Sequence, residues 1–173
     1  MVPALAVAAP KQRKDPMKDI AVLFVCLGNI CRSPLAEAAF RREAAEAGLA
    51  ARVDSAGTGD WHIGDPPDAR ACAEAMRHGV DISGYRARQV ATADFREFTH
   101  IVALDEKNLA DLRARMPADA TASLSLLLDH LEGSAGQSVK DPYFGEAEGF
   151  ADTWAEVTLA TAALVRQLAT NLR

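Results

Sequence analysis

The fold of this chain is decided by the stretch Ile20-Ala-Val-Leu-Phe-Val-Cys-Leu-Gly-Asn-Ile-Cys-Arg-Ser-Pro34. Residues 20–25 form a continuous apolar run rich in β-branched side chains, which is typical of a strand buried on both faces of a parallel sheet. Ser33 predicts the N-cap of a helix, and Pro34 suits the first helical position. Residues 26–32 are therefore a short loop between the end of a buried strand and the start of a helix.

Strands and helices alternate along the rest of the chain. Further strands are predicted over residues 49–54, 100–104 and 124–128, and helices over 34–47, 68–77, 93–98, 106–115 and 146–171. This alternation indicates an α/β fold in one domain, with a doubly wound, four-stranded parallel sheet of the flavodoxin-like class and helices on both faces. Such sheets bind ligands beyond the carboxyl ends of their strands, which is where Cys26 stands.

Composition narrows the class of protein. The 173 residues suit one domain with a substantial core, assigned to residues 18–173. Residues 1–17 are expected to be a disordered N-terminal extension, because their charges follow the apolar stretch rather than precede it as in a signal peptide. A net charge of −5 argues against nucleic-acid binding, which needs a basic surface. No apolar run approaches the ~18 residues of a membrane span.

The cysteines bear on the compartment and on metal binding. Cys26, Cys31 and Cys72 are too few, and odd in number, for a disulfide scaffold, so we expect a reducing cytoplasm. The spacings of cysteine and histidine match no zinc motif, and we expect no metal and no cofactor.

The loop carries the residue types that phosphate-ester cleavage by a thiol needs. In the pattern Cys-x5-Arg-Ser, Cys26 stands at a helix N-terminus beside a cation, a setting that favours a thiolate nucleophile. Loop amides can cradle a phosphate, and Gly28 and Asn29 tolerate the left-handed backbone of a wrapped loop. Arg32 offers a planar fork for two phosphate oxygens, and Ser33 can donate a hydrogen bond to the Cys26 sulfur.

A lone cysteine at a strand end is more often a small buried hydrophobe than a nucleophile. Here the complete string in a strand-loop-helix context outweighs that alternative. Two other phosphate loops are excluded, because the chain has no G-x4-G-K-[ST] motif and the pair Gly57-x-Gly59 lacks the third glycine of a dinucleotide fingerprint.

The pattern resembles the low-molecular-weight protein tyrosine phosphatases over about residues 18–173. The resemblance is carried by the ordered motifs Val22-Leu-Phe-Val-Cys-Leu-Gly-Asn-Ile-Cys-Arg-Ser-Pro34, Asp54-Ser-Ala-Gly-Thr58, Trp61-His-Ile-Gly64, Pro67-Asp-Ala-Arg-Ala71, His78-Gly-Val80, Arg86-Ala-Arg-Gln89, Leu104-Asp-Glu-Lys-Asn-Leu109 and Asp141-Pro-Tyr-Phe-Gly145. It implies hydrolysis of protein phosphotyrosine through a phosphocysteine, without a metal.

The resemblance also supplies the general acid, which spacing alone does not reveal. The family's acid is the aspartate of a D-P-Y-[YF]-G loop, so Asp141 is expected to protonate the departing phenolate and then to activate water. Without the resemblance, an Asp-Pro pair would indicate no more than a turn. The phosphate loop of the family matches Leu27, Gly28, Asn29, Ile30, Cys31 and Ser33, between the nucleophile Cys26 and the clamp Arg32.

Substrate selection is expected at the rim of the site. Family members line a deep slot with aromatic side chains, and Trp61, Tyr143 and Phe144 occupy the matching positions, with ordinary packing as the alternative. Ile30 resembles the tyrosine-directed members, whereas members that act on phosphoarginine tend to carry threonine there.

Supporting residues are expected around the loop. Asn29, Ser33 and Ser55 match a hydrogen-bond network of the family, which usually ends in a histidine where this chain has Tyr85. Asp105 matches an acidic residue beside the loop arginine, with a helix cap as the alternative.

The other two cysteines have different expected roles. Cys31 matches a second loop cysteine that can trap Cys26 as a reversible disulfide under peroxide, with packing as the alternative. Cys72 stands at an apolar position of a predicted helix and is assigned to the core.

Three alternatives remain open on the same residues. An arsenate reductase needs a relay of further cysteines, and Cys72 on its helix suits that role poorly. A phosphoarginine phosphatase is disfavoured by Ile30, and a non-catalytic phosphopeptide reader would not need Cys26 and Asp141. The expected partners are phosphotyrosine proteins, with a tyrosine kinase as a further candidate, and the chain is expected to be a monomer or weak dimer.

Overall fold

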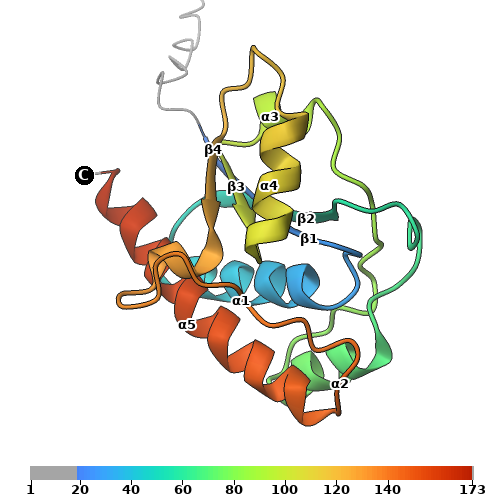
Figure 1. The fold of residues 1–173 in the computed structure, drawn as a ribbon. Coiled ribbons are helices and arrows are strands. Elements are labelled where there is room, and N and C mark those ends of the chain that lie inside the picture. Colours follow the sequence, from blue (N-terminus) through green and yellow to red (C-terminus); the bar gives the residue numbers. More distant parts are fainter. Residues whose placement is uncertain (1–18, 173) are drawn as a thin grey trace, which may run out of the picture.

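A four-stranded parallel sheet forms the centre of the computed structural model, which describes residues 19–172 (Figure 1). The strands are β1 (Ile20–Cys26), β2 (Ala51–Gly57), β3 (His100–Ala103) and β4 (Ser123–Leu126), in the spatial order β2-β1-β3-β4. Because β1 pairs with β2 on one side and β3 on the other, it is central, and the predicted flavodoxin-like class is confirmed. The predicted extension, 1–17, lies outside the described residues.

Helices cover both faces of this sheet. One face is covered by α1 (Arg32–Glu46), α2 (Ala69–Arg77) and α5 (Glu148–Thr170), and the other by α3 (Asp94–Glu97) and α4 (Glu106–Arg115) (Figure 1). All residues of β1 are buried. Val22 and Phe24 belong to the first core layer and Leu23 and Val25 to the second, because successive side chains of a strand point to opposite faces. This two-sided burial explains the unbroken apolar run.

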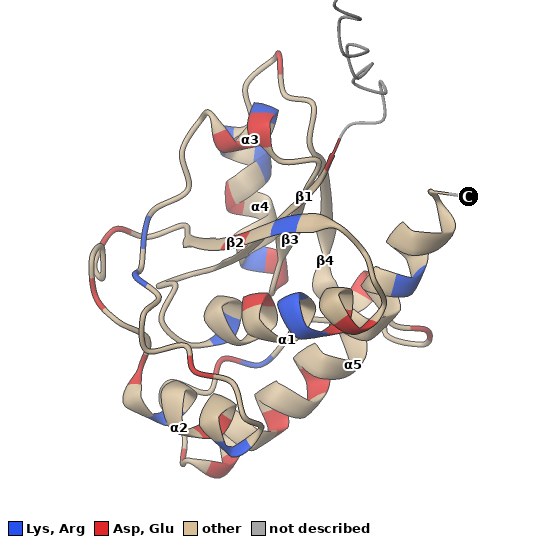
Figure 2. Cartoon of the chain, turned by 180° about the vertical axis from the view of Figure 1, so that it is seen from behind, with Lys and Arg blue, Asp and Glu red and all other residues tan. Residues whose placement is uncertain are grey.

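Charge is spread over the fold rather than gathered in one layer. Basic and acidic residues are interspersed along the helices and loops (Figure 2). Among residues 19–172, none of the helices has the length and apolar character that crossing a bilayer would take.

Two of the four strands differ from the prediction by two or more residues at one end or both, and the other two by a single residue. β2 covers residues 51–57 instead of 49–54, because it pairs in register along the whole of β1, from Ile20 opposite Ala51 to Cys26 opposite Gly57. The strand predicted over 124–128 is wrong at its end, since the chain enters the 3-10 helix η1 (Leu127–His130). The ends of both strands are set by pairing with a neighbouring strand, and the local sequence pattern carries no information on that partner.

One carboxyl group is buried between α1 and the sheet. The Glu37 side chain is 5 % exposed, and its Oε2 lies 3.5 Å from Nη2 of Arg41, which also donates a hydrogen bond to the Val53 carbonyl. Burial raises the pKa of Glu37 to about 7, against the opposing effect of Arg41. The folded protein therefore holds a proton on Glu37 at pH values where an unfolded glutamate has lost it.

This burial predicts a pH dependence of stability. Because the pKa of Glu37 is higher in the folded protein, binding of a proton to Glu37 stabilises the fold. This stabilisation is complete below the ordinary pKa of 4.5 and is lost as the pH rises through about 7. The difference corresponds to about 3 kcal/mol in the free energy of unfolding. We expect Glu37→Gln to lose less stability than the wild type between pH 4.5 and 8, measured by urea unfolding at constant ionic strength.

The matched control is Glu46→Gln, at an exposed position of the same helix. It should leave the wild-type dependence on pH unchanged. Parallel stability curves for the wild type and Glu37→Gln would contradict the prediction.

Candidate active site

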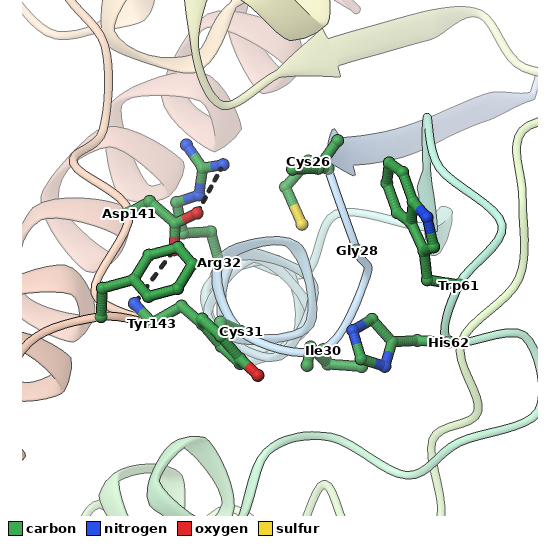
Figure 3. Close-up of a pocket in the computed structure, with 11 residues that line it drawn as sticks. Cys26, Gly28, Ile30, Cys31, Arg32, Trp61, His62, Asp141 and Tyr143 are labelled. Carbon is green, nitrogen blue, oxygen red and sulfur yellow. Dashed lines mark hydrogen bonds and ion pairs between the residues drawn. The ribbon is translucent and has the colours of Figure 1, made fainter.

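The sulfur of Cys26 lies at the carboxyl end of β1, above the start of α1 (Figure 3). It accepts a hydrogen bond from the backbone N–H of Asn29 at 3.3 Å and lies 3.0 Å from Oγ of Ser33. Asn29 has a φ of 58°, the left-handed conformation that bends the loop back around the sulfur. The loop of residues 27–33 thereby directs a backbone amide at the candidate nucleophile.

The predicted helix cap at Ser33 is wrong. α1 begins at Arg32, its N-cap position is Cys31, and no side chain caps the helix. Ser33 instead accepts a hydrogen bond from Nδ2 of Asn29 at 2.8 Å, and its hydroxyl lies 3.0 Å from the Cys26 sulfur and 3.5 Å from the Ala56 carbonyl oxygen, the two groups to which it can donate. The first amides of α1 therefore remain available to an anion.

Asn29 is held by three side-chain hydrogen bonds. Its Nδ2 donates to Ser33 and to Ser55 at 3.0 Å, and its Oδ1 accepts from the backbone N–H of Arg88 at 3.0 Å. Since Asn29 is 3 % exposed, these bonds satisfy a buried amide and fix the unusual backbone of the loop. The structure thus brings together the three residues predicted as a supporting network.

Tyr85, at the position where the family network usually ends, lies half-buried against Glu37 and Arg41. Burial and the Glu37 carboxylate raise the pKa of Tyr85, and Arg41 opposes them. Glu37 also interacts with Ser55. Among residues 19–172, the hydrogen-bond partners of the Asn29 side chain are Ser33, Ser55 and Arg88, and Tyr85 is not one of them.

The guanidinium of Arg32 is buried, and two hydrogen bonds from its Nη1 fix its orientation. Its Nη1 donates to Oδ2 of Asp105 at 2.7 Å and to the Val139 carbonyl at 3.0 Å. Asp105 also caps α4, because its Oδ1 accepts from the backbone N–H of Asn108 at 2.7 Å. Both predictions for Asp105, cap and arginine partner, therefore describe the same carboxylate. With Nη1 occupied, Nη2 faces the pocket.

Asp141 reaches the same place from a distant part of the chain. Its Oδ2 lies 3.6 Å from Nη2 of Arg32, and its Oδ1 accepts a hydrogen bond from the backbone N–H of Tyr143 at 3.1 Å (Figure 3). The carboxyl group is 39 % exposed and borders the pocket that contains Cys26. A thiol, a guanidinium and a carboxyl group thus surround one space.

This pocket has a volume of about 290 Å³ and is formed by loops beyond the carboxyl ends of the strands. Trp61 and Tyr143 lie on opposite sides of it (Figure 3), and Phe144 extends outward with 92 % of its surface exposed. The lining contains the predicted loop, acid and aromatic residues, namely Cys26, Leu27, Gly28, Ile30, Cys31, Arg32, Trp61, Asp141, Tyr143 and Phe144. The floor is polar and the walls are aromatic, which suits a phosphate on an aryl group.

Sequence reasoning missed two features in and around the pocket. His62 lines it and packs over Gly28, where a Cβ atom would come within 3.1 Å of the His62 ring. Gly57 is required at the end of β2, because a Cβ atom there would lie 2.7 Å from the Leu27 carbonyl oxygen. Both residues belong to motifs of the resemblance, Trp61-His-Ile-Gly64 and Asp54-Ser-Ala-Gly-Thr58, which could have pointed to them. A motif does not show, however, which atoms each residue contacts.

Comparison with known proteins agrees with this geometry. The family described as low molecular weight phosphotyrosine protein phosphatase matches residues 21–173. A protein of that name from Schizosaccharomyces pombe is 42 % identical over 143 residues, which are 81 % of this chain and 91 % of the relative.

Solved structures share the fold. The crystal structure of YfkJ from Bacillus subtilis has a TM-score of 0.84 at 38 % identity, covering 92 % of this chain and 100 % of the other. The Drosophila arginine phosphatase DARP has a TM-score of 0.79 at 30 % identity, covering 85 % and 96 %. The family match, the sequence relatives and the shared fold lead to one conclusion: this chain belongs to the low-molecular-weight phosphotyrosine protein phosphatase family.

Proposed function

We propose that this protein hydrolyses phosphotyrosine in protein substrates through a phosphocysteine on Cys26. The observation that carries the proposal is the position of the Cys26 sulfur over the uncapped start of α1, in one pocket with Arg32 and Asp141. A nucleophile, a clamp for phosphate oxygens and a proton donor are the groups that such a reaction requires.

In the first step, the Cys26 thiolate attacks phosphorus in line with the leaving oxygen. The amides of residues 27–33 and the free edge of Arg32 stabilise the negative charge on the equatorial oxygens. Asp141 gives its proton to the departing phenolate, so that tyrosine leaves as a neutral alcohol. The product on the enzyme is a phosphocysteine.

In the second step, the Asp141 carboxylate takes a proton from water, and the water attacks phosphorus. The Cys26 sulfur leaves as a thiolate. The Ser33 hydroxyl, 3.0 Å away, stabilises that thiolate by a hydrogen bond. Phosphate is released, and the proton on Asp141 is restored for the next cycle.

The substrate class follows from the walls of the pocket. Trp61 and Tyr143 on opposite sides form a slot for a planar aryl group. Ile30 offers an apolar contact at the loop position where phosphoarginine-directed members tend to carry threonine. DARP shares the fold at 30 % identity, so arginine phosphatase activity is the second candidate, and the aromatic walls favour tyrosine.

Two other functions lack support in the pocket. An arsenate reductase would need a relay cysteine. Cys72, on α2, is partly buried, its thiol donates to the Pro67 carbonyl just before that helix, and it does not line the pocket. A phosphopeptide reader would not need an acid beside Arg32.

Because the reaction depends on a reduced thiol, we place the protein in the cytoplasm.

The substrate class is tested with phosphotyrosine and phosphoarginine peptides of the same sequence. We expect the higher kcat/KM for phosphotyrosine, because its ring fills the slot, and no hydrolysis of either peptide by Cys26→Ser. A preference for phosphoarginine would overturn the assignment of substrate, and full activity of Cys26→Ser would overturn the mechanism.

The role of Asp141 predicts a defect confined to proton transfer. Asp141→Asn should lower kcat on phenyl phosphate by ~10²–10⁴-fold, because the leaving phenolate is no longer protonated. The measurement is steady-state kcat on phenyl phosphate for the wild type and the variant at the same pH. An unchanged kcat would remove Asp141 from the mechanism.

We also propose that Cys31 protects Cys26 during oxidation. Peroxide converts the Cys26 thiolate to a sulfenic acid; the Cys31 thiol then attacks that sulfur, forming a disulfide and releasing water. Burial, Asp68 and the Cys26 charge raise the pKa of Cys31, so oxidation of Cys26 removes one of the causes that keep Cys31 protonated.

The measurement is recovery of activity by dithiothreitol after a peroxide pulse. Cys31→Ser should recover less activity than the wild type, because its sulfenic acid proceeds to irreversible forms. Cys72→Ser is the matched control and should recover as the wild type does. Equal recovery of all three proteins would contradict a protective disulfide.

A further inference from the structure

Arg70, in the first turn of α2, makes contacts that the mechanism above does not use. Its Nε and Nη2 form a fork on the two carboxylate oxygens of Asp68, each at 3.0 Å. The same guanidinium donates to the carbonyl oxygens of Tyr143 at 3.0 Å and Gly145 at 3.2 Å. Arg70 therefore joins α2 to the backbone of residues 141–145, which carries the candidate acid.

Two aromatic rings add to this attachment. The guanidinium carbon lies 5.7 Å from the centre of the Tyr143 ring and 4.6 Å from that of Phe150, a buried residue of α5. Both distances are within the range of cation–π attraction. The arginine thus holds the acid segment against a rigid helix as well as against α2.

The acid segment has few other attachments. Among the hydrogen bonds of residues 19–172, those that reach the backbone of residues 141–145 from outside that segment are the two from Arg70. Inside the segment, Gly145 bonds to Pro142 and Tyr143 bonds to Asp141. Besides the contact of the Asp141 carboxylate with Arg32 at 3.6 Å, Arg70 is therefore the hydrogen-bonded link between the acid segment and the rest of the described fold.

The other end of the attachment is the phosphate loop. The backbone N–H of Asp68 donates to the Ile30 carbonyl at 2.8 Å, and Asp68 is the N-cap of α2. Ile30, Asp68 and Arg70 thus form a continuous path of hydrogen bonds from the loop that holds the nucleophile to the segment that holds the acid. A displacement of this path would change the distance between Cys26 and Asp141.

We propose that Arg70 is a positioning residue, which holds Asp141 where it can protonate the leaving group. The inference rests on the proposed function, since it assigns Asp141 as the acid. It attributes to Arg70 an effect on proton transfer and none on phosphate binding, because Arg70 does not line the pocket.

The test compares substrates that differ in their need for an acid. Phenyl phosphate has a basic leaving group and 2,4-dinitrophenyl phosphate has one that departs without a proton. We expect Arg70→Ala to lower kcat/KM on phenyl phosphate, which reports the step in which the leaving group departs, by about 10- to 100-fold, the effect of a small misplacement of a catalytic group. The effect on kcat/KM of the dinitrophenyl ester should be much smaller.

The same substitution is then made in Asp141→Asn. With the acid already removed, Arg70→Ala should change kcat/KM on phenyl phosphate by less than about twofold. Inhibition by inorganic phosphate should be the same with and without Arg70→Ala in each background, since Arg70 does not line the pocket. Arg70→Lys should behave like the alanine variant, because a lysine ammonium cannot span the carboxylate and the two carbonyls as a planar fork does.

Arg77→Ala is the matched control. Arg77 lies at the other end of α2, its side chain is 72 % exposed, and it pairs with Glu74 at 3.4 Å. Its removal should leave both esters unaffected.

The outcomes separate the two proposals. Suppose that Asp141→Asn slows phenyl phosphate hydrolysis, so that the acid assignment stands. The positioning role of Arg70 is then overturned if the loss from Arg70→Ala adds in full to that of Asp141→Asn, and also if Arg70→Ala slows both esters equally. If Asp141→Asn has no effect, the acid assignment fails and the role of Arg70 fails with it.

Discussion

The pairing of β1 on both of its edges is the constraint on which the site depends. Because β2 and β3 occupy the two sides of β1, the backbone of Cys26 cannot move without breaking a ladder of hydrogen bonds. The pairing continues past the strand, where Thr58 and Gly59 donate to the carbonyls of Cys26 and Leu27. The candidate nucleophile is thereby fixed to the most buried element of the fold.

The phosphate loop is rigid because a buried polar network holds it. Asn29 places its backbone amide on the sulfur and uses its side chain to join the loop to β2 through Ser55 and to Arg88 beyond it. A buried amide that lost one of these partners would carry an unsatisfied group, which costs ~1–3 kcal/mol. This penalty favours the single loop conformation that aims amides at one point, which is the preorganisation that stabilisation of a charged transition state needs.

The acid and the aromatic walls are held in a different way. They lie on exposed segments at the rim of the pocket, and Asp141 meets Arg32 across 3.6 Å while Asp105 holds the far edge of the guanidinium. The buried loop and the more exposed Trp61, His62 and Tyr143 line one pocket. In the proposed reaction, the loop holds the phosphate that all substrates share, and these rim residues face the part that differs. Substrate selection can therefore vary without changes to the chemistry.

Features that depend on neighbours along the chain could be predicted from the amino-acid sequence. The apolar run of 20–25, the loop of 26–32 and the alternation of strands and helices are local patterns, and they predicted the sheet and the place of Cys26 and Arg32. Asp141 was reached through the family's motif, because no local pattern relates it to a loop more than a hundred positions earlier.

Only the tertiary structure decided what each polar side chain contacts. Ser33 was predicted to cap a helix and instead faces Cys26 and Asn29, since the folded loop brings those partners closer than the amides of its own helix. Tyr85 meets Glu37 on α1, and the guanidinium of Arg70 reaches carbonyls 73 and 75 positions away. A hydrogen bond is directional and effective over about 3 Å, so its partner is fixed by packing in three dimensions and not by spacing in the sequence.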